Sequence, residues 1–214
     1  RIAAENGTTG CKMYNNLIYD IRTSGNNINF YNPFGIRIDG GINHKIYYNS
    51  INMYGAFRGS SSNPEQRFSS AILISTGSVS GMDIRNNIFK NKMTYDNVYW
   101  PYDWPYVYAI YAVSGTTFST IDYNDYYSSS SGAFYNLGFL GTDIYTLTDW
   151  KTVTGQDIHS ISSDPLFKSD SYLIPYPSSP VLRSGAPLLE VTTDYTGSER
   201  NILNPSIGGY EAAY

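Results

Sequence analysis

The stretch GIRIDGGINHKIYYNSI, residues 35–51, decides the fold. Polar residues alternate with Ile36 and Ile38, and again around Ile46. A period of two places successive side chains on opposite faces, as in a β-strand with one buried face, whereas a helix needs a period near 3.6. Gly and Asn in residues 39–43 separate the two apolar runs, as turn-forming residues do. The stretch therefore predicts two short strands joined by a turn.

The same pattern occurs four times, each time with an Asn three positions after the apolar residue of the second strand. These asparagines are 33, 38 and 37 residues apart, at Asn16, Asn49, Asn87 and Asn124. Strands this short bury an apolar face only when each copy stacks on the next, which predicts a β-solenoid. We expect the four amides to lie one above another and to hydrogen-bond, each at a corner where Asn tolerates left-handed backbone.

Composition narrows the class of protein. Only 15% of residues are charged and 16% are aromatic, which disfavours a disordered chain and a coiled coil. The net charge of −4 lacks the basic surplus of a nucleic-acid binder, and no apolar run is long enough to predict membrane insertion. Cys11 is the single cysteine, which excludes an internal disulfide and predicts a buried, inert thiol. His44 and His159 stand in unrelated contexts, so no metal site is predicted.

The repeats resemble those of right-handed parallel β-helix proteins, the superfold of pectate lyases, and residues 35–51 resemble a near-consensus coil of that family. From Tyr123 onward, several blocks follow in an order similar to the closing segment of large secreted bacterial β-helix proteins. These blocks are YNDYY, DWKTVTGQDIHSISSDPLF, SSPVLRSGAPL, DYTGSER and IGGYE. The resemblance implies an all-β, right-handed parallel β-helix with a C-terminal cap, secreted or on the cell surface.

The expected organisation is a single domain, residues 1–214, with repeated coils over 1–130 and final coils plus cap over 131–214. One short helix is predicted around Asp149–Thr154, capped by Thr146 or Thr148 and ended by Gly155. The start lacks both an initiator Met and the family's N-terminal cap. We therefore expect a piece of a longer precursor, whose uncapped start contacts either the preceding part of that precursor or another chain.

Candidate catalytic residues come from the positions just before and just after the inward residue of the second strand in each repeat. These positions point outward, and equivalent ones stack from repeat to repeat in two files. If the register holds, Lys45, Asp83, Arg85 and Asp122 form a mixed-charge patch. The resemblance implies a polysaccharide lyase, in which Lys or Arg abstracts a proton and Asp residues hold Ca²⁺. A glycoside hydrolase acting through two carboxylates is the other enzymatic reading. Ordinary ion pairs between coils remain the favoured interpretation, because no lyase or hydrolase motif is present.

Candidate ligand-binding residues lie in two long segments between repeats. Residues 95–108 hold five Tyr and two Trp, and a protruding loop of this kind can stack on sugar rings. The predicted binding residues there are Tyr99, Trp100, Tyr102, Trp104 and Tyr106, joined by Arg58 and Arg67 from the preceding long segment. The alternative is that these rings fold back onto the coils. The expected function is therefore a module that binds polysaccharide or glycan, with an enzyme acting on acidic polysaccharide as the alternative.

Overall fold

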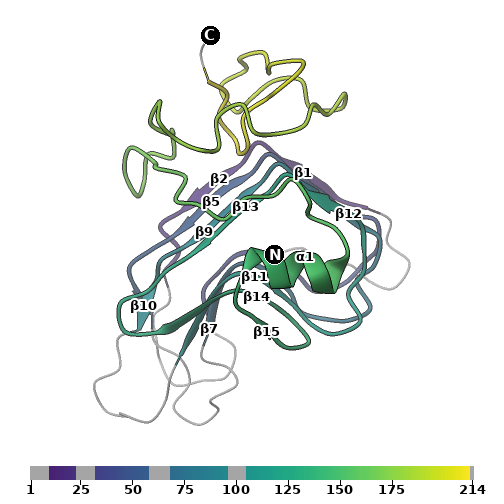
Figure 1. The fold of residues 1–214 in the computed structure, drawn as a ribbon, viewed down its shortest axis with the longest axis vertical. Helices are drawn as coiled ribbons and strands as arrows, with labels where there is room; N and C mark the ends of the chain where they lie inside the picture. The colour runs from purple at the N-terminus through teal and green to yellow at the C-terminus, as the bar shows by residue number, and fades with distance from the viewer. Residues whose placement is uncertain (1–9, 23–31, 58–67, 96–104, 213–214) are drawn as a thin grey trace.

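The computed structural model describes residues 10–22, 32–57, 68–95 and 105–212 of the chain (Figure 1). In these residues the fold is all-β with one short helix, and its sheets are almost entirely parallel. This arrangement is compatible with a β-solenoid. The first repeat gives β1 (Lys12–Tyr14) and β2 (Leu17–Tyr19), and the second gives β3 (Phe34–Ile38), β4 (Lys45–Tyr47), β5 (Ser50–Met53) and β6 (Ala56–Phe57).

The later repeats continue the same order. The third comprises β7 (Phe68–Ile74), β8 (Met82–Arg85), β9 (Ile88–Asn91) and β10 (Thr94–Tyr95). The fourth comprises β11 (Tyr106–Ala112), β12 (Phe118–Asp122) and β13 (Asp125–Ser128), and β14 (Phe134–Leu140) and β15 (Asp143–Ile144) follow. One short sheet pairs β10 with β6.

Each of the three larger sheets takes one strand from successive repeats. We call β1-β4-β8-β12 the charged sheet, β2-β5-β9-β13 the third sheet, and β3-β7-β11-β14 with the antiparallel β15 the aromatic sheet. In the predicted register, Ile46 pairs with Ile84, and Ile84 with Ile121. These isoleucines are fully buried in one continuous core. The period-two pattern therefore predicted the inward side chains correctly.

The predicted asparagine ladder is confirmed. The Nδ2 atoms of Asn16, Asn49 and Asn87 donate to the Oδ1 atoms of Asn49, Asn87 and Asn124, over 2.8, 2.9 and 3.0 Å. The expectation of left-handed backbone at these asparagines is wrong by one residue. The residues just before them have the positive φ, between 52° and 60°, at Asn15, Tyr48, Asn86 and Tyr123.

Helix α1 (Leu147–Thr154) covers the last repeat. It begins two residues before the predicted start, with Thr146 as its cap, and Gly155 ends it with a left-handed φ of 65°. Trp150 is fully buried and packs against Phe118 and Tyr126. The apolar side chains at this end of the core are thereby covered.

The chain after Ile161 then turns back along the outside of the repeats, which the prediction of a terminal cap did not anticipate. The segment of residues 162–211, here called the return segment, lies outside the corner between β1 and β2 in Figure 1. The backbone carbonyl of Ala186 accepts a hydrogen bond from Asn86, and that of Thr193 accepts one from Asn15, 178 residues away. The return segment therefore contacts the third repeat and the first.

The sequence blocks that resemble a closing segment supply contacts between the return segment and the repeats. The guanidinium carbon of Arg200 lies 3.7 Å from the centre of the Tyr48 ring, and Arg200 also pairs with buried Glu211. Gly208 has a φ of 93°, and a Cβ there would lie 2.6 Å from the Ser50 hydroxyl oxygen, so only glycine fits. The blocks thus hold the return segment against the corner.

Cys11 is exposed, so the prediction of a buried thiol is wrong, because β1 lies at the edge of the charged sheet in the described part of the chain. None of the described helices is long and apolar enough to cross a membrane.

Candidate functional site

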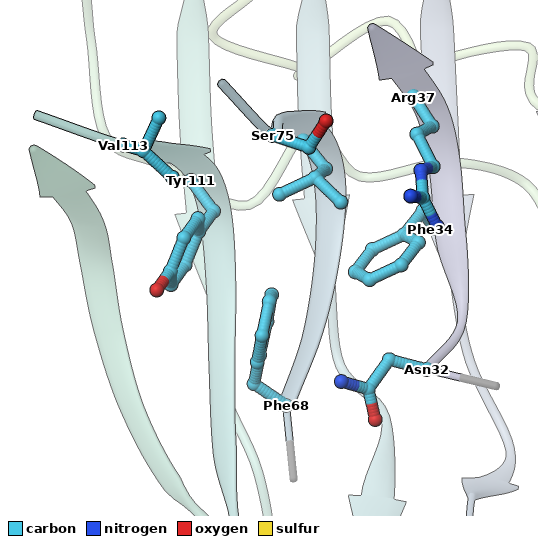
Figure 2. Close-up of a pocket in the computed structure, with 8 residues that line it drawn as sticks. Asn32, Phe34, Arg37, Phe68, Ser75, Tyr111 and Val113 are labelled. Carbon is cyan, nitrogen blue, oxygen red and sulfur yellow. The ribbon is translucent and has the colours of Figure 1, made fainter. Parts of the chain in front are cut away.

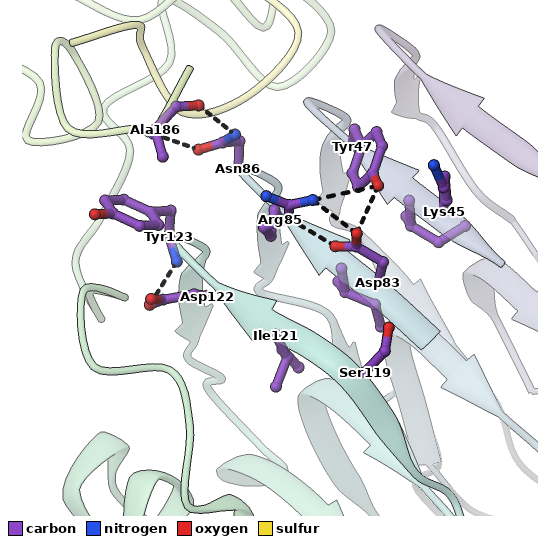
Figure 3. Close-up of polar contacts among 12 residues, drawn as sticks. Lys45, Tyr47, Asp83, Arg85, Asn86, Ser119, Ile121, Asp122, Tyr123 and Ala186 are labelled. Carbon is purple, nitrogen blue, oxygen red and sulfur yellow. Dashed lines mark hydrogen bonds and ion pairs between the residues drawn. The ribbon is translucent and has the colours of Figure 1, made fainter. Parts of the chain in front are cut away.

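The four candidate catalytic residues lie on the outer face of the charged sheet, in the predicted files. Lys45 is in register with Asp83, and Arg85 with Asp122 (Figure 3). Asp83 and Arg85 form a two-pronged ion pair, with Nε to Oδ1 and Nη2 to Oδ2 both at 2.7 Å. The Tyr47 hydroxyl donates to Asp83 Oδ2 over 2.7 Å, and burial together with this bond raises the Tyr47 pKa. These three side chains form one compact cluster.

Lys45 and Asp122 make no direct contact with Asp83 or Arg85. Figure 3 draws no contact from either of them to Asp83 or Arg85. Lys45 Nζ pairs instead with Glu190 of the return segment, over 2.9 Å. Asp122 Oδ2 lies 2.8 Å from His159 Nδ1, and its Oδ1 accepts from the backbone amide of His159. Glu190 also lies 3.3 Å from the Tyr47 hydroxyl, so it links Lys45 to the cluster, whereas Asp122 contacts His159 instead.

The carboxylates do not suit the calcium ion that the resemblance implies. Both oxygens of Asp83 accept from Arg85, and both oxygens of Asp122 bond to His159. Ca²⁺ requires six to eight oxygen ligands, so a site here needs carboxylate oxygens that these contacts already use. In the described residues no group of three or more His, Cys, Asp or Glu side chains is placed to hold a metal ion. The residues present therefore do not fit the ion.

The outer face of the aromatic sheet is the other candidate. Six aromatic rings from four adjacent strands contact one another across it. They are Phe34, Phe68, Tyr106, Tyr108, Tyr111 and Phe139, and Phe134 packs beside Tyr106. Tyr111 lies between Phe68 and Phe139, stacked on each with centroids 4.3 Å apart. Both faces of the Tyr111 ring are thus covered. Ring surface for a ligand must come from the ends of this row and from neighbouring rings.

One cavity, here called the arginine cavity, lies at the β3 end of the sheet. Its volume is about 200 Å³, and its lining includes Phe34, Arg37, Phe68, Ser75 and Tyr111 (Figure 2). Arg37 lies over the Phe34 ring, with its guanidinium carbon 5.8 Å from the centroid. The arginine cavity therefore combines aromatic rings with hydrogen-bonding side chains.

A larger cavity, here called the tyrosine cavity, lies beside β14, towards the other end of the aromatic sheet. Its volume is about 400 Å³, and it is lined by Tyr106, Ala133, Phe134, Tyr135, Asn136 and Tyr145. Tyr145 is 69% exposed and Tyr135, which is in register with the inward-facing Val107, is 55% exposed. Asn136 is buried, and its Nδ2 has no hydrogen-bond partner among the described residues. Open rings and a polar side chain therefore line the same cavity.

Tyr106 is the one predicted binding residue that falls in the described part of the chain, and it lines the tyrosine cavity. Tyr99, Trp100, Tyr102, Trp104, Arg58 and Arg67 lie outside the described residues. The segments that contain them connect to the starts of β11 and β7, at one edge of the aromatic sheet.

Sequence reasoning missed Phe134, Tyr135, Asn136 and Tyr145. The only signal in the sequence was that the final coil, residues 133–145, carries four aromatic residues without the spacing of the earlier repeats. Arg37 was also missed, although it stands between the two inward isoleucines of the stretch that decides the fold.

Comparisons of the chain with protein-family models, with curated proteins and with solved structures give no match.

Proposed function

We propose that the chain is a right-handed parallel β-helix of the pectate-lyase-like superfold that binds glycan at the β14 end of its aromatic sheet. The tyrosine cavity carries the proposal, because it combines two open tyrosine rings with the polar side chain of Asn136. The one-strand-per-repeat register and the asparagine ladder support the β-helix part.

Sugars suit this chemistry. A pyranose has apolar C–H faces that pack on aromatic rings, while its hydroxyls both donate and accept hydrogen bonds. Tyr135 and Tyr145 supply exposed rings, and Asn136 adds a polar side chain to the lining. Binding sites for small molecules are typically concave and mostly apolar with a few placed polar groups, as this cavity is.

Binding is favoured over polysaccharide lysis because the charged side chains already have partners. Lys45 is paired with Glu190, and Arg85 with Asp83. A lyase needs a base that is free to accept a proton and a cation that is free to neutralise the substrate's carboxylate. The resemblance of the closing blocks supports a secreted or cell-surface location as part of the same proposal.

The test compares wild type with Tyr135→Ala/Tyr145→Ala on a glycan array, followed by calorimetric titration of the glycans that bind. Each lost ring contact is worth about 1 kcal/mol, so we expect the double variant to bind about tenfold or more weakly. Tyr176→Ala is the matched control, because this tyrosine is 49% exposed on the return segment, outside both cavities. Equal binding by the double variant and wild type contradicts the proposal.

A further inference from the structure

A buried lysine meets a carboxylate where β9 contacts the return segment. Phe89 points into the core, so Lys90 lies on the outer face of β9, where only 6% of it is exposed. Its Nζ lies 2.6 Å from Asp164 Oδ1, 5.4 Å from the centre of the Tyr127 ring and 5.7 Å from that of Phe167. Burial takes water away from the charged amine, which favours passing its proton to the carboxylate.

A second acid, Asp125, lies beside this pair. Tyr127 of β13 is in register with Lys90, and Asp125 stands two residues before Tyr127 on the same face of that strand. Asp125 Oδ1 accepts from the backbone amide of Ser163, the neighbour of Asp164, over 3.0 Å. Its Oδ2 is buried and has no hydrogen-bond partner among the described residues. The amine and two carboxyl groups are therefore gathered at one place.

The surroundings of Asp125 favour its protonated form. Burial raises the Asp125 pKa well above its usual value, and the nearby charge of Asp164 raises it further. The Ser163 amide and the charge of Lys90 act in the opposite direction but do not cancel this rise. A carboxyl group that keeps its proton can donate it to a leaving group.

The backbone supplies a donor for negative charge on Asp164. The amide of Leu166 donates to Asp164 Oδ1 over 3.0 Å, and this is the oxygen that also contacts Lys90. Attack of the amine on the carboxyl carbon would place charge on this oxygen, where a donor already aimed at it is stabilising. Because a carboxyl C–O bond is about 1.2 Å long, Nζ lies within about 4 Å of that carbon. The reacting groups thus need little rearrangement.

We propose that Lys90 and Asp164 condense to an amide between their side chains, which joins β9 covalently to the return segment and releases one water. The ammonium first passes a proton to the Asp164 carboxylate, leaving a neutral amine and a carboxyl group. The nitrogen lone pair then forms the C–N bond, and the C=O electron pair moves to Oδ1.

Asp125 completes the condensation as proton donor. It gives its proton to the departing hydroxyl of Asp164, the C–O bond breaks, water leaves, and the electron pair on Oδ1 restores the C=O bond. The new amide nitrogen then returns a proton to Asp125. One ammonium and one carboxylate have become one neutral amide and one water, so no oxidant, reductant or further reactant is needed.

The neighbouring ion pair, Lys92 with Asp170, lacks these features. Its side chains are 35% and 45% exposed, whereas that of Lys90 is 8% exposed. Asp170 contacts the amide of Asn52, in place of a buried acid. We therefore expect this pair to remain an ion pair, which makes Lys92 the matched control.

Mass spectrometry of the denatured wild-type chain tests the inference. We expect a mass lower than that of the sequence by one water, and a tryptic digest in which residues 86–92 are joined to residues 152–168. Lys90→Arg keeps the positive charge but removes the amine, so it should retain the full mass and give no joined peptides. Lys92→Arg should lose one water and give joined peptides as wild type does.

Asp125→Ala removes the proton donor, so the freshly purified variant should remain largely unjoined. Asp125→Asn still offers a hydrogen-bond donor at this position and should reach the same joined state as wild type. A wild type that is folded by circular dichroism and keeps its full mass after prolonged incubation overturns the inference. A loss of water confined to a single peptide, or one that persists in Lys90→Arg, also overturns it. Equal joining in Asp125→Ala and wild type overturns the role given to Asp125.

Discussion

Asn87 shows how a single side chain joins three repeats. It is fully buried, and its Nδ2 donates to the carbonyls of Ile46 and Arg85 and to Asn124 Oδ1. Its Oδ1 accepts from both the backbone amide and Nδ2 of Asn49. Every polar atom of the amide group is therefore used, which explains why the chain repeats this residue at one fixed position.

We expect Asn87→Ala to lower the free energy of unfolding by about 3 kcal/mol or more, because it leaves several buried groups without partners at about 1 to 3 kcal/mol each. Urea titration followed by circular dichroism measures this loss. Asn16→Ala is the matched control, since Asn16 is exposed at the end of the ladder and should cost less than about 1 kcal/mol. Equal losses in the two variants would show that the ladder does not stabilise the core through its hydrogen bonds.

The contribution of Asp125 to stability depends on pH. It is fully buried, its Oδ2 has no partner among the described residues, and burial raises its pKa well above the usual value. Because the folded state holds the proton more tightly than the unfolded state, this group favours folding fully below its unfolded pKa, about 4. That contribution is lost as pH rises towards the folded pKa.

Asp125→Asn removes this ionisation while keeping the oxygen that accepts from the Ser163 amide. We expect the variant to be more stable than wild type at pH 8 and similar at pH 4, so its melting temperature should depend less on pH. Differential scanning calorimetry across this range checks the difference. A variant less stable than wild type at pH 8 would show that the carboxylate is stabilised when ionised.

At the scale of elements, lysines of the first three repeats hold the return segment. Lys12 and Lys45 both pair with Glu190, over 2.6 and 2.9 Å, while Lys90 pairs with Asp164 and Lys92 with Asp170. The two lysines lower the Glu190 pKa to about 2. The partners come from distant parts of the sequence, which is why sequence reasoning placed Lys45 in an outward file but not in this ion pair.

Since the Glu190 pKa is lowered on folding, its contribution is present above the unfolded pKa near 4.5 and is lost as pH falls towards 2. The carboxylate is partly exposed, so the contribution is small, up to about 1 kcal/mol. We expect Glu190→Gln to speed amide hydrogen exchange near residue 190 at pH 7, with Glu199→Gln as the control on the same segment. Unchanged exchange in Glu190→Gln contradicts a role for these ion pairs.

Elements also differ in how far the sequence predicted them. Period-two runs predicted the inward isoleucines, and Gly155 predicted the end of α1, because these signals are local. The two cavities depend on rings from several strands, on the register between those strands, and on Tyr145, which follows the last repeat. Nothing in the order of residues indicates which rings stack with each other and which remain open.

At the scale of the whole molecule, stacking of the four repeats followed from the sequence because each copy has an apolar face that it cannot bury alone. The position of the return segment did not follow, since its contacts join residues up to 185 positions apart. The segment has five prolines between residues 165 and 187, which lack the amide donor of a regular strand but carry no information about which surface the segment covers.

The return segment also bears on when the fold can be completed. Asn15 leaves the ribosome well before Thr193, its hydrogen-bond partner, and Tyr48 well before Arg200, which lies over its ring. During translation the corner formed by the early repeats therefore stays uncovered until the return segment has been made. A nascent chain that is released early would lack this cover, even though every strand of its sheets had already been synthesised.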